Sequence, residues 1–306
     1  MFSYRHAFHA GNHADVLKHT VLLATLDYLK QKDVALTLID THAGNGIYRL
    51  DGDFAQTSNE SASGIQQLIA TATNAQEALD PTVARYLDMV RQFNDELSSR
   101  TKRLVYPGSP ALLQHSMRSQ DQLHLFELQP ADMRALQGNM EQGPYANHTH
   151  VWHEESFKGS LRFLPPPSRR GLVLCDPSYE LKTDYQQVSQ WLSEALRKFA
   201  TGTYLIWYPV IPRPEAHELP RKLKAIARQA GRGWLHTTLA IKSGGKPGVQ
   251  LPGEKVERTG MVASGMVVIN PPYILREQLQ KALPELVRAL GQDHLAAHTL
   301  ESAEAP

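Results

Sequence analysis

The residues from 171 to 180, GLVLCDPSYE, form a short apolar run that ends in a carboxylate, a proline, a serine and an aromatic ring. The exocyclic amine of adenine is a poor nucleophile because its lone pair is delocalised into the ring. The Asp176 carboxylate and the Pro177 backbone carbonyl can accept the amino hydrogens and turn that lone pair toward a methyl carbon. Tyr179 can stack on the base, a contact worth about 1–3 kcal/mol in single-strand binding. The tetrapeptide is therefore typical of methyl transfer to adenine, although it also fits a plain strand-to-turn junction.

A second stretch, LTLIDTHAGNGIYRL, runs from an apolar strand into a loop that holds Gly44 and Gly46. Ligands of open α/β sheets bind beyond the carboxyl ends of the strands, and glycine lets the backbone approach a ligand closely. The spacing is not G-x-G-x-x-G, which disfavours a dinucleotide pyrophosphate. The turn suits a ligand without phosphates, such as S-adenosylmethionine, although such turns are often purely structural.

Two later strands also end in polar residues. Glu127 follows one of them, where an acid can accept hydrogen bonds from both ribose hydroxyls of a cofactor. Glu155 and Ser156 follow the next, where they can meet the cofactor's adenine. Each acid alone is typical of a solvated strand end, but successive polar ends favour one shared ligand site.

A third motif, VVINPPYIL at 267–275, is similar to the Asn-Pro-Pro-Tyr of amine methyltransferases. It follows the last predicted strand, far along the sheet from the glycine turn. We therefore do not expect it to be catalytic.

The elements that must position these residues alternate between strands and helices, which predicts an α/β fold with a mostly parallel sheet. The final pair of strands has only a Gly- and Pro-containing loop between its members, so we expect that pair to be antiparallel. Seven strands that end in such a hairpin are the layout of Rossmann-like methyltransferases. The predicted strands lie at 35–40, 122–128, 150–155, 171–176, 203–209, 234–241 and 265–270.

The region 53–104 interrupts this alternation with two helical patterns and no strand pattern. Asp80 suits the N-cap of the second helix, and Pro81 suits its first turn. We interpret 53–104 as a helical subdomain inserted into one Rossmann-like domain of 1–52 and 105–306. The alternative is a pair of ordinary crossover helices.

The composition bounds the class of protein. The chain has 306 residues, a formal net charge of +1 and one cysteine, Cys175, so it has no internal disulfide and fits a reducing cytosol. Neither a signal peptide nor a run of about 20 apolar residues is recognisable, so we expect a cytoplasmic protein without membrane contact. The histidines 6, 9, 13, 19 and 42 have no cysteine near them, and we expect no metal.

The chain resembles one family closely, that of ribosomal RNA large subunit methyltransferase J, an adenine-N6 methyltransferase of 23S ribosomal RNA. The matching segments are SYRHAFHAGNHADVLKH at 3–19, DTHAGNGIYRL at 40–50, YPGSP at 106–110, FELQP at 126–130 and RRGLVLCDPSYE at 169–180. The resemblance implies a Rossmann-like class I S-adenosylmethionine-dependent methyltransferase fold with an inserted helical subdomain. It also implies S-adenosylhomocysteine as the second product, and Asp176 as the catalytic residue, joined by Pro177 and Tyr179.

The same resemblance assigns cofactor and substrate contacts. The implied cofactor-binding residues are Lys18, His19, His42, Ser109, Glu127, Glu155, Ser156 and Asp176. Gly44 of the glycine turn joins them as a predicted cofactor contact. Tyr4 matches a family position near the active site, where it would contact substrate with Tyr179. The family usually has Asp-Pro-Pro-Tyr where this chain has Ser178, and Asp-Gly where this chain has Glu155 and Ser156.

The substrate implied by the resemblance is 23S ribosomal RNA. Arg169 and Arg170 belong to the basic groups that would hold its phosphates if they surround Asp176. We expect the chain to act as a monomer. Two alternatives stay open, namely the same chemistry on DNA or a protein amide, and an RNA-binding protein without catalysis.

Overall fold

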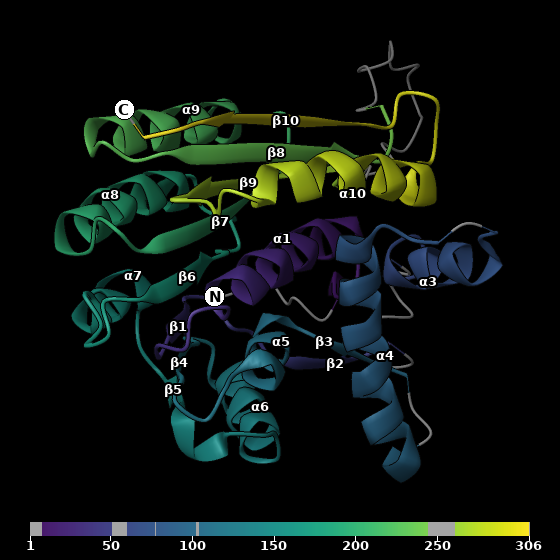
Figure 1. The fold of residues 1–306 in the computed structure, drawn as a ribbon, viewed down its shortest axis with the longest axis horizontal. Helices are drawn as coiled ribbons and strands as arrows, with labels where there is room; N and C mark the ends of the chain where they lie inside the picture. The colour runs from purple at the N-terminus through teal and green to yellow at the C-terminus, as the bar shows by residue number, and fades with distance from the viewer. Residues whose placement is uncertain (1–7, 51–59, 77, 102–103, 244–260, 306) are drawn as a thin grey trace, which may run out of the picture.

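The computed structural model describes residues 8–50, 60–76, 78–101, 104–243 and 261–305. Its centre is an eight-stranded sheet in the order β10-β8-β9-β7-β6-β1-β4-β5 (Figure 1). The strands are β1 (Thr37–Asp40), β4 (Gln122–Phe126), β5 (Thr149–Trp152), β6 (Gly171–Cys175), β7 (Thr203–Val210), β8 (Trp234–Ala240), β9 (Ala263–Ile269) and β10 (Ala297–Ala303).

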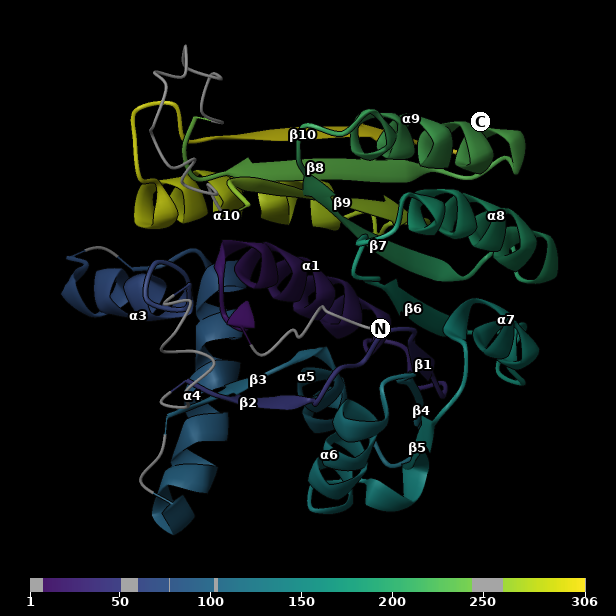
Figure 2. The ribbon, with the colours of Figure 1, turned by 180° about the vertical axis from the view of Figure 1, so that it is seen from behind.

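Helices cover both faces of this sheet. Strands such as β1 and β6 are therefore buried along their whole length. On one face α1 (His13–Leu29) and α10 (Leu275–Leu290) pack on the β7–β9 region, and α5 (Ser109–Ser116) and α6 (Pro130–Glu141) continue the layer. On the other face lie α7 (Ser156–Ser160), α8 (Lys182–Lys198) and α9 (Pro214–Gln229), which Figure 2 shows on the side away from α3 and α4.

The seven predicted strands are all present, but the predicted strand number is too low. An eighth strand, β10, pairs antiparallel with β8 from Ala297↔Ala240 to Ala303↔Trp234. The antiparallel pairing predicted for β8 and β9 is confirmed, and β9 is also antiparallel to β7. A separate two-stranded sheet of β2 (Ile47–Arg49) and β3 (Val105–Pro107) was not predicted.

The register of the parallel strands decides which residues meet. Asp40 at the end of β1 is level with Leu125 of β4 and with Leu174 of β6. Residues that follow these positions therefore leave the sheet at one edge, and Glu127 and Asp176 do so two residues beyond the level of Asp40. The buried Cys175 is the last residue of β6.

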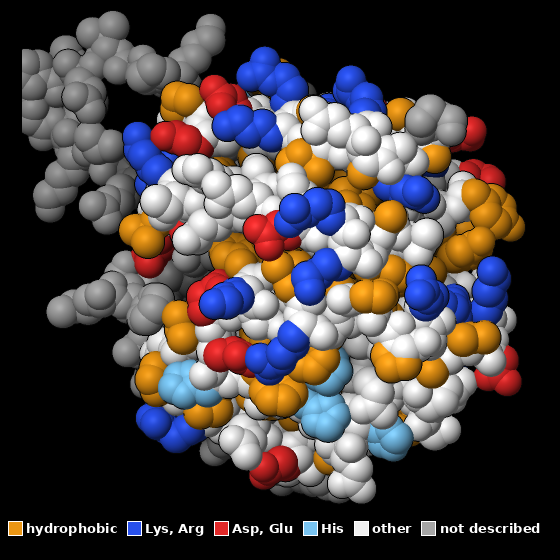
Figure 3. Space-filling view, turned by 90° about the vertical axis from the view of Figure 1, so that its left-hand side faces the viewer, with side chains coloured by type: hydrophobic (Ala, Val, Ile, Leu, Met, Phe, Trp, Pro, Cys, Tyr) orange, Lys and Arg blue, Asp and Glu red, His pale blue; other side chains and the backbone are white. Residues whose placement is uncertain are grey.

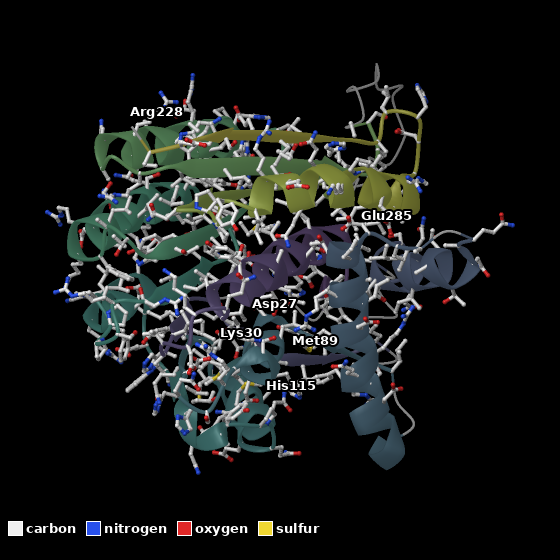
Figure 4. The ribbon with its side chains drawn as sticks, in the orientation of Figure 1. Asp27, Lys30, Met89, His115, Arg228 and Glu285 are labelled. Atoms are coloured by element: carbon white, nitrogen blue, oxygen red, sulfur yellow. The ribbon has the colours of Figure 1, made fainter. Side chains whose placement is uncertain are left out.

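The two helices predicted between the first and second strands are α3 (Ile65–Asn74) and α4 (Pro81–Thr101). The Arg85 Nε of α4 donates to Asp27 Oδ2 of α1 at 2.8 Å, and the backbone N–H of Asp80 donates to Glu285 Oε2 of α10 at 2.8 Å. Figure 4 shows Asp27 on α1 and Met89 on α4, the two helices that this ion pair connects. Buried residues of α3 and α4 belong to the same core as the sheet, and the division into domains stays a prediction.

The helix α1 begins as predicted at Asn12, whose side-chain oxygen accepts the N–H groups of Ala14 and Asp15 at 3.0 Å each. Its residues from His13 to Leu26 are all buried, since the sheet covers one side and helices α4, α5 and α10 cover others. Any charged side chain in this stretch must therefore find a partner inside the protein.

Candidate functional site

A cavity of about 310 Å³ opens at the sheet edge where β1, β4, β5 and β6 end. Its volume lies at the lower end of the range of about 300–1,000 Å³ that is typical of small-molecule sites. The predicted site residues that line it are Lys18, His42, Gly44, Ser109, Glu127, Glu155, Ser156, Asp176 and Pro177. The structure thus brings together most of the residues that the sequence assigned to a cofactor.

The glycine turn after β1 forms one wall of the cavity. Gly44 and Gly46 have φ values of 61° and 77°, which favour glycine. A Cβ on Gly44 would also collide with the Tyr48 hydroxyl. The turn therefore depends on glycine both for its backbone conformation and for the space beside the cavity.

Glu127 connects this turn with the end of β4. Its Oε2 accepts the N–H of Gly44 at 2.9 Å, and its Oε1 accepts the N–H of Gln129 at 2.7 Å. Burial raises the pKa of Glu127 despite these hydrogen bonds. A carboxylate accepts about four hydrogen bonds, so each oxygen keeps capacity for a ligand hydroxyl.

Asp40 is a residue of the site that sequence reasoning missed. It is fully buried, its Oδ2 accepts the Ser109 hydroxyl at 2.6 Å, and its Oδ1 accepts the His42 N–H at 3.2 Å. Burial raises its pKa to about 6. The available signal was an acid as the last residue of a buried strand, directly before the glycine turn.

His42 and Ser156 both line the cavity, with His42 Nε2 at 3.3 Å from Ser156 Oγ. Burial lowers the pKa of His42 to about 3, so the imidazole is neutral. The neighbouring Glu155 caps α7, where its carboxylate accepts the N–H groups of Phe157 and Lys158 at 2.7 and 2.9 Å. Its main task in this structure is helix capping, at the rim of the cavity.

His19 lies elsewhere. Its Nδ1 is 2.7 Å from the Tyr106 hydroxyl, which in turn is 2.9 Å from the Tyr86 hydroxyl of α4. His19 lines neither of the two cavities described here. This arrangement does not support the implied direct contact between His19 and a cofactor, because the His19 ring packs against Tyr86 of α4 and Tyr106.

The charged centre of the site is Asp176. Its Oδ2 lies 2.5 Å from Lys18 Nζ, and Lys18 Nζ lies 2.8 Å from Asp15 Oδ1. Asp176 and Lys18 line the first cavity and also a second one of about 290 Å³, whose wall includes Asp15, Trp207 and Tyr179. The catalytic candidate thus borders both cavities.

Tyr179 borders the second cavity but is only 2% exposed. Its hydroxyl donates to the Trp207 carbonyl at 2.7 Å, and its ring packs on Tyr185 with 4.7 Å between centroids. Its φ of 53° lies in the left-handed region. The prediction that Tyr179 stacks on the base needs correction, because this ring is fixed in the wall of the cavity and offers little free face.

The condition under which Arg169 and Arg170 would hold phosphates beside Asp176, namely that they surround it, is not met. They precede β6, whereas Asp176 follows it, and a five-residue strand spans about 16 Å. The Arg170 guanidinium donates to the carbonyls of Leu29 and Val34 at 2.5 and 3.0 Å, at the opposite sheet edge. Tyr4, the other predicted substrate contact, lies outside the described residues.

The Asn-Pro-Pro-Tyr motif also lies at the far edge, because β9 runs antiparallel and ends level with Tyr204 at the start of β7. Asn270 Nδ2 donates to the carbonyls of Ala200 and Gly202 at 2.9 and 2.7 Å. Its polar side chain secures a turn, which supports the prediction that the motif is not catalytic.

Comparison with known proteins decides the family. Residues 33–301 match the model of a family described as "Ribosomal RNA large subunit methyltransferase D, RlmJ". The chain belongs to this RlmJ family. Two curated RlmJ relatives are both named ribosomal RNA large subunit methyltransferase J. The Escherichia coli K12 protein is 40% identical over 286 residues, with 94% of this chain and 93% of the relative covered. The Haemophilus influenzae protein is 38% identical over 301 residues, with 98% of each covered.

A solved structure agrees with the RlmJ fold. The crystal structure of protein LPL1258 from Legionella pneumophila has a TM-score of 0.78 and 29% sequence identity, and the match covers 97% of this chain and 98% of that one. Together with membership of the RlmJ family, the large sheet with helices on both faces supports the predicted fold, that of S-adenosylmethionine-dependent methyltransferases. Within the described part of this RlmJ chain, no helix is long and apolar enough to cross a membrane.

Proposed function

We propose that this chain transfers the methyl group of S-adenosylmethionine to the N6 amine of an adenine in 23S ribosomal RNA. One observation carries the proposal: Asp176 and Lys18 border two neighbouring cavities at the carboxyl edge of the sheet. Membership of the RlmJ family supports the substrate class.

The first cavity fits the cofactor. Gly44 lines this cavity, and the spare acceptor capacity of Glu127 beside it suits a pair of ribose hydroxyls. Neutral His42 and Ser156 offer hydrogen bonds without adding charge near a cationic ligand. When bound, S-adenosylmethionine supplies a methyl group on a positively charged sulfur.

The second cavity suits the acceptor base, since Asp176, Tyr179 and Trp207 border it. The Asp176 carboxylate, through Oδ1, and the Pro177 carbonyl would hold the two amino hydrogens, because Lys18 donates to Oδ2. The N6–methyl bond then forms as the sulfur–methyl bond breaks, and that electron pair returns to sulfur. The surplus N6 proton leaves through the Asp176 carboxylate to water, and positioning supplies most of the rate.

The substrate must bring its adenine to the sheet edge, and a base inside a duplex must first be flipped out. On the face that Figure 3 shows, Lys and Arg side chains lie among Asp and Glu and form no unbroken basic field among the described residues.

The deciding experiment compares wild type with Asp176→Asn in transfer of a radiolabelled methyl group to 23S ribosomal RNA that lacks the modification, followed by nucleoside analysis. We expect N6-methyladenosine from wild type and a loss of at least about 100-fold in kcat for the variant. Binding of S-adenosylhomocysteine, measured by calorimetry, should stay within about threefold because that ligand carries no methyl.

Parallel assays with DNA and with a glutamine-containing protein substrate separate the alternatives. Methylation of DNA or of the protein in preference to the RNA would overturn the assigned substrate. RNA binding without any methyl transfer by wild type would favour the non-catalytic alternative.

We further propose a cytoplasmic monomer in which 53–104 form an inserted subdomain. The β2–β3 pair supports the insertion, because it brings the two ends of that region together. Light scattering of the full chain during turnover would test the monomer.

A further inference from the structure

Arg213 borders the second cavity and directly precedes helix α9. Its Nη1 donates to the carbonyl oxygens of Tyr179 and Glu180, at 3.3 and 3.4 Å. Glu180 follows Asp176 by four residues, and four residues of extended chain span at most about 14 Å. The Arg213 side chain is therefore fastened to the turn that carries Asp176.

The second cavity contains many acidic groups. The described residues that line it include four with carboxylates, namely Asp15, Glu60, Asp176 and Glu180. Such groups attract the amino hydrogens of a base, but they repel the phosphates of the nucleotide that carries this base. A positive charge beside the cavity would offset this repulsion.

The described residues of this lining that can carry a positive charge are His9, Lys18 and Arg213. Two of them face acids at short range. Lys18 Nζ lies 2.8 Å from Asp15 Oδ1 and 2.5 Å from Asp176 Oδ2. His9 Nδ1 lies 3.0 Å from Glu60 Oε1. The charges of Lys18 and His9 are thus opposed inside the protein.

Arg213 differs from these two, because its guanidinium binds carbonyl oxygens and forms no ion pair among the described residues. Glu215 is near enough to feel its charge, but Glu215 pairs with Lys182 at 3.3 Å. The Tyr185 phenol is also near and stays neutral, because burial raises its pKa. Three of the five N–H donors of arginine belong to Nε and Nη2, and this fork suits a phosphate.

We propose that Arg213 is a substrate-binding residue, whose guanidinium holds a backbone phosphate of the acceptor nucleotide while its base enters the second cavity. This inference rests on the proposed function for the identity of the substrate. A phosphate contact carries no sequence information but fixes the position of the strand. Since Arg213 is also fastened to the turn after Asp176, the contact would place the base relative to the catalytic carboxylate.

The test is the salt dependence of RNA binding, measured on the full chain with S-adenosylhomocysteine present. A protein cation that neutralises a phosphate releases counterions, so the slope of log affinity against log salt reports such contacts. In Arg213→Gln we expect the Kd for 23S ribosomal RNA to rise about tenfold and the slope to become shallower by about 0.7–0.9. The Kd for S-adenosylhomocysteine should stay within about threefold of the wild-type value.

Matched variants separate the charge of Arg213 from its contacts with the turn. Arg213→Lys keeps the charge but loses the planar fork, so the slope should stay at the wild-type value. Arg228→Gln makes the same chemical change at an exposed position near the other end of α9 (Figure 4), and its RNA affinity and slope should equal those of wild type. The same loss in Arg228→Gln as in Arg213→Gln would mean a general effect of surface charge and would overturn the proposal.

A higher Kd with an unchanged slope in folded Arg213→Gln would also overturn it, because losing the carbonyl contacts alone releases no counterions. If that variant fails to fold, inhibition of methyl transfer in Arg213→Lys decides. Adenosine 5′-monophosphate should inhibit wild type more strongly than adenosine does, and the lysine variant should lose part of this preference. An unchanged preference, or none in wild type, would refute the phosphate contact. Failure of the proposed function looks different, since wild type would then transfer no methyl group to the RNA.

Discussion

Glu127 illustrates how one side chain can serve the local structure and a ligand at once. Its carboxylate accepts N–H groups from Gly44 and Gln129, one on each oxygen. In Glu127→Gln one oxygen becomes an amide NH₂, which faces one of these N–H donors with another donor. We expect the Kd for S-adenosylmethionine to rise about tenfold, measured by calorimetry.

The control for this prediction is Glu141→Gln, the same change at an exposed position of α6. Its affinity should equal that of wild type. A Glu127→Gln protein with wild-type affinity would show that the carboxylate only shapes the turn and contributes no contact.

Residues at the ends of strands were predictable, because the carboxyl ends of parallel strands share one edge of the sheet. Asp15 and Asp40 were not recognised, since an acid in the first turn of a helix or at the end of a strand is usually solvated. Arg170 was predicted to hold phosphates, but its guanidinium donates to backbone carbonyls instead. Nothing in its local sequence indicates these carbonyl partners. Whether these charged residues are solvated or buried depends on contacts with residues far away in the sequence, which local patterns do not show.

At the scale of elements, the contact of α4 with α1 and β3 depends on a buried chain of hydroxyl groups. Tyr86 on α4 is 2.9 Å from the Tyr106 hydroxyl, which also contacts His19 of α1. Tyr86→Phe removes one member, and we expect the free energy of unfolding to fall by about 1 kcal/mol. Urea denaturation measures this loss, and cofactor affinity should not change.

Tyr145→Phe, at an exposed position, provides the comparison and should leave stability within about 0.5 kcal/mol of wild type. If the two variants were equally stable, the hydroxyl chain would not be what fastens α4 to the sheet domain.

The elements that sequence reasoning missed are those with weak patterns. β10 is an edge strand with polar and exposed residues in alternation with half-buried ones, so its apolar signal is faint. β2 and β3 have three residues each, too few for any periodicity. The buried strands were found because apolar runs of strand length between helices leave few other arrangements.

For the whole molecule, stability should decrease in acid. Burial lowers the pKa of His13 and His124 to about 4 and that of His42 to about 3, whereas in the unfolded chain each histidine titrates near 6.5. The unfolded state therefore binds more protons below pH 6.5, and stability falls as the pH drops toward the folded values. Asp40 opposes this trend, since its pKa is raised to about 6 and its burial becomes less costly in acid.

Burial also lowers the pKa of His236, whereas the pKa values of His9 and Glu127 are raised and act in the same direction as Asp40. We expect a net loss of stability between pH 6.5 and pH 4, with a slope of up to about 1.4 kcal/mol per pH unit for each histidine whose pKa is lowered. Urea unfolding at several pH values measures this slope, and His124→Gln should make it shallower. A flat profile over this interval would mean that the buried imidazoles accept protons without opening the fold.

The single cysteine has a practical consequence. Cys175 is buried at the end of β6, one residue before Asp176, and burial raises the pKa of its thiol. An alkylating reagent can reach this sulfur only while the central strands separate. The rate at which a thiol-reactive dye labels Cys175 thus measures how often the sheet opens transiently. The measurement needs no cysteine introduced by mutation.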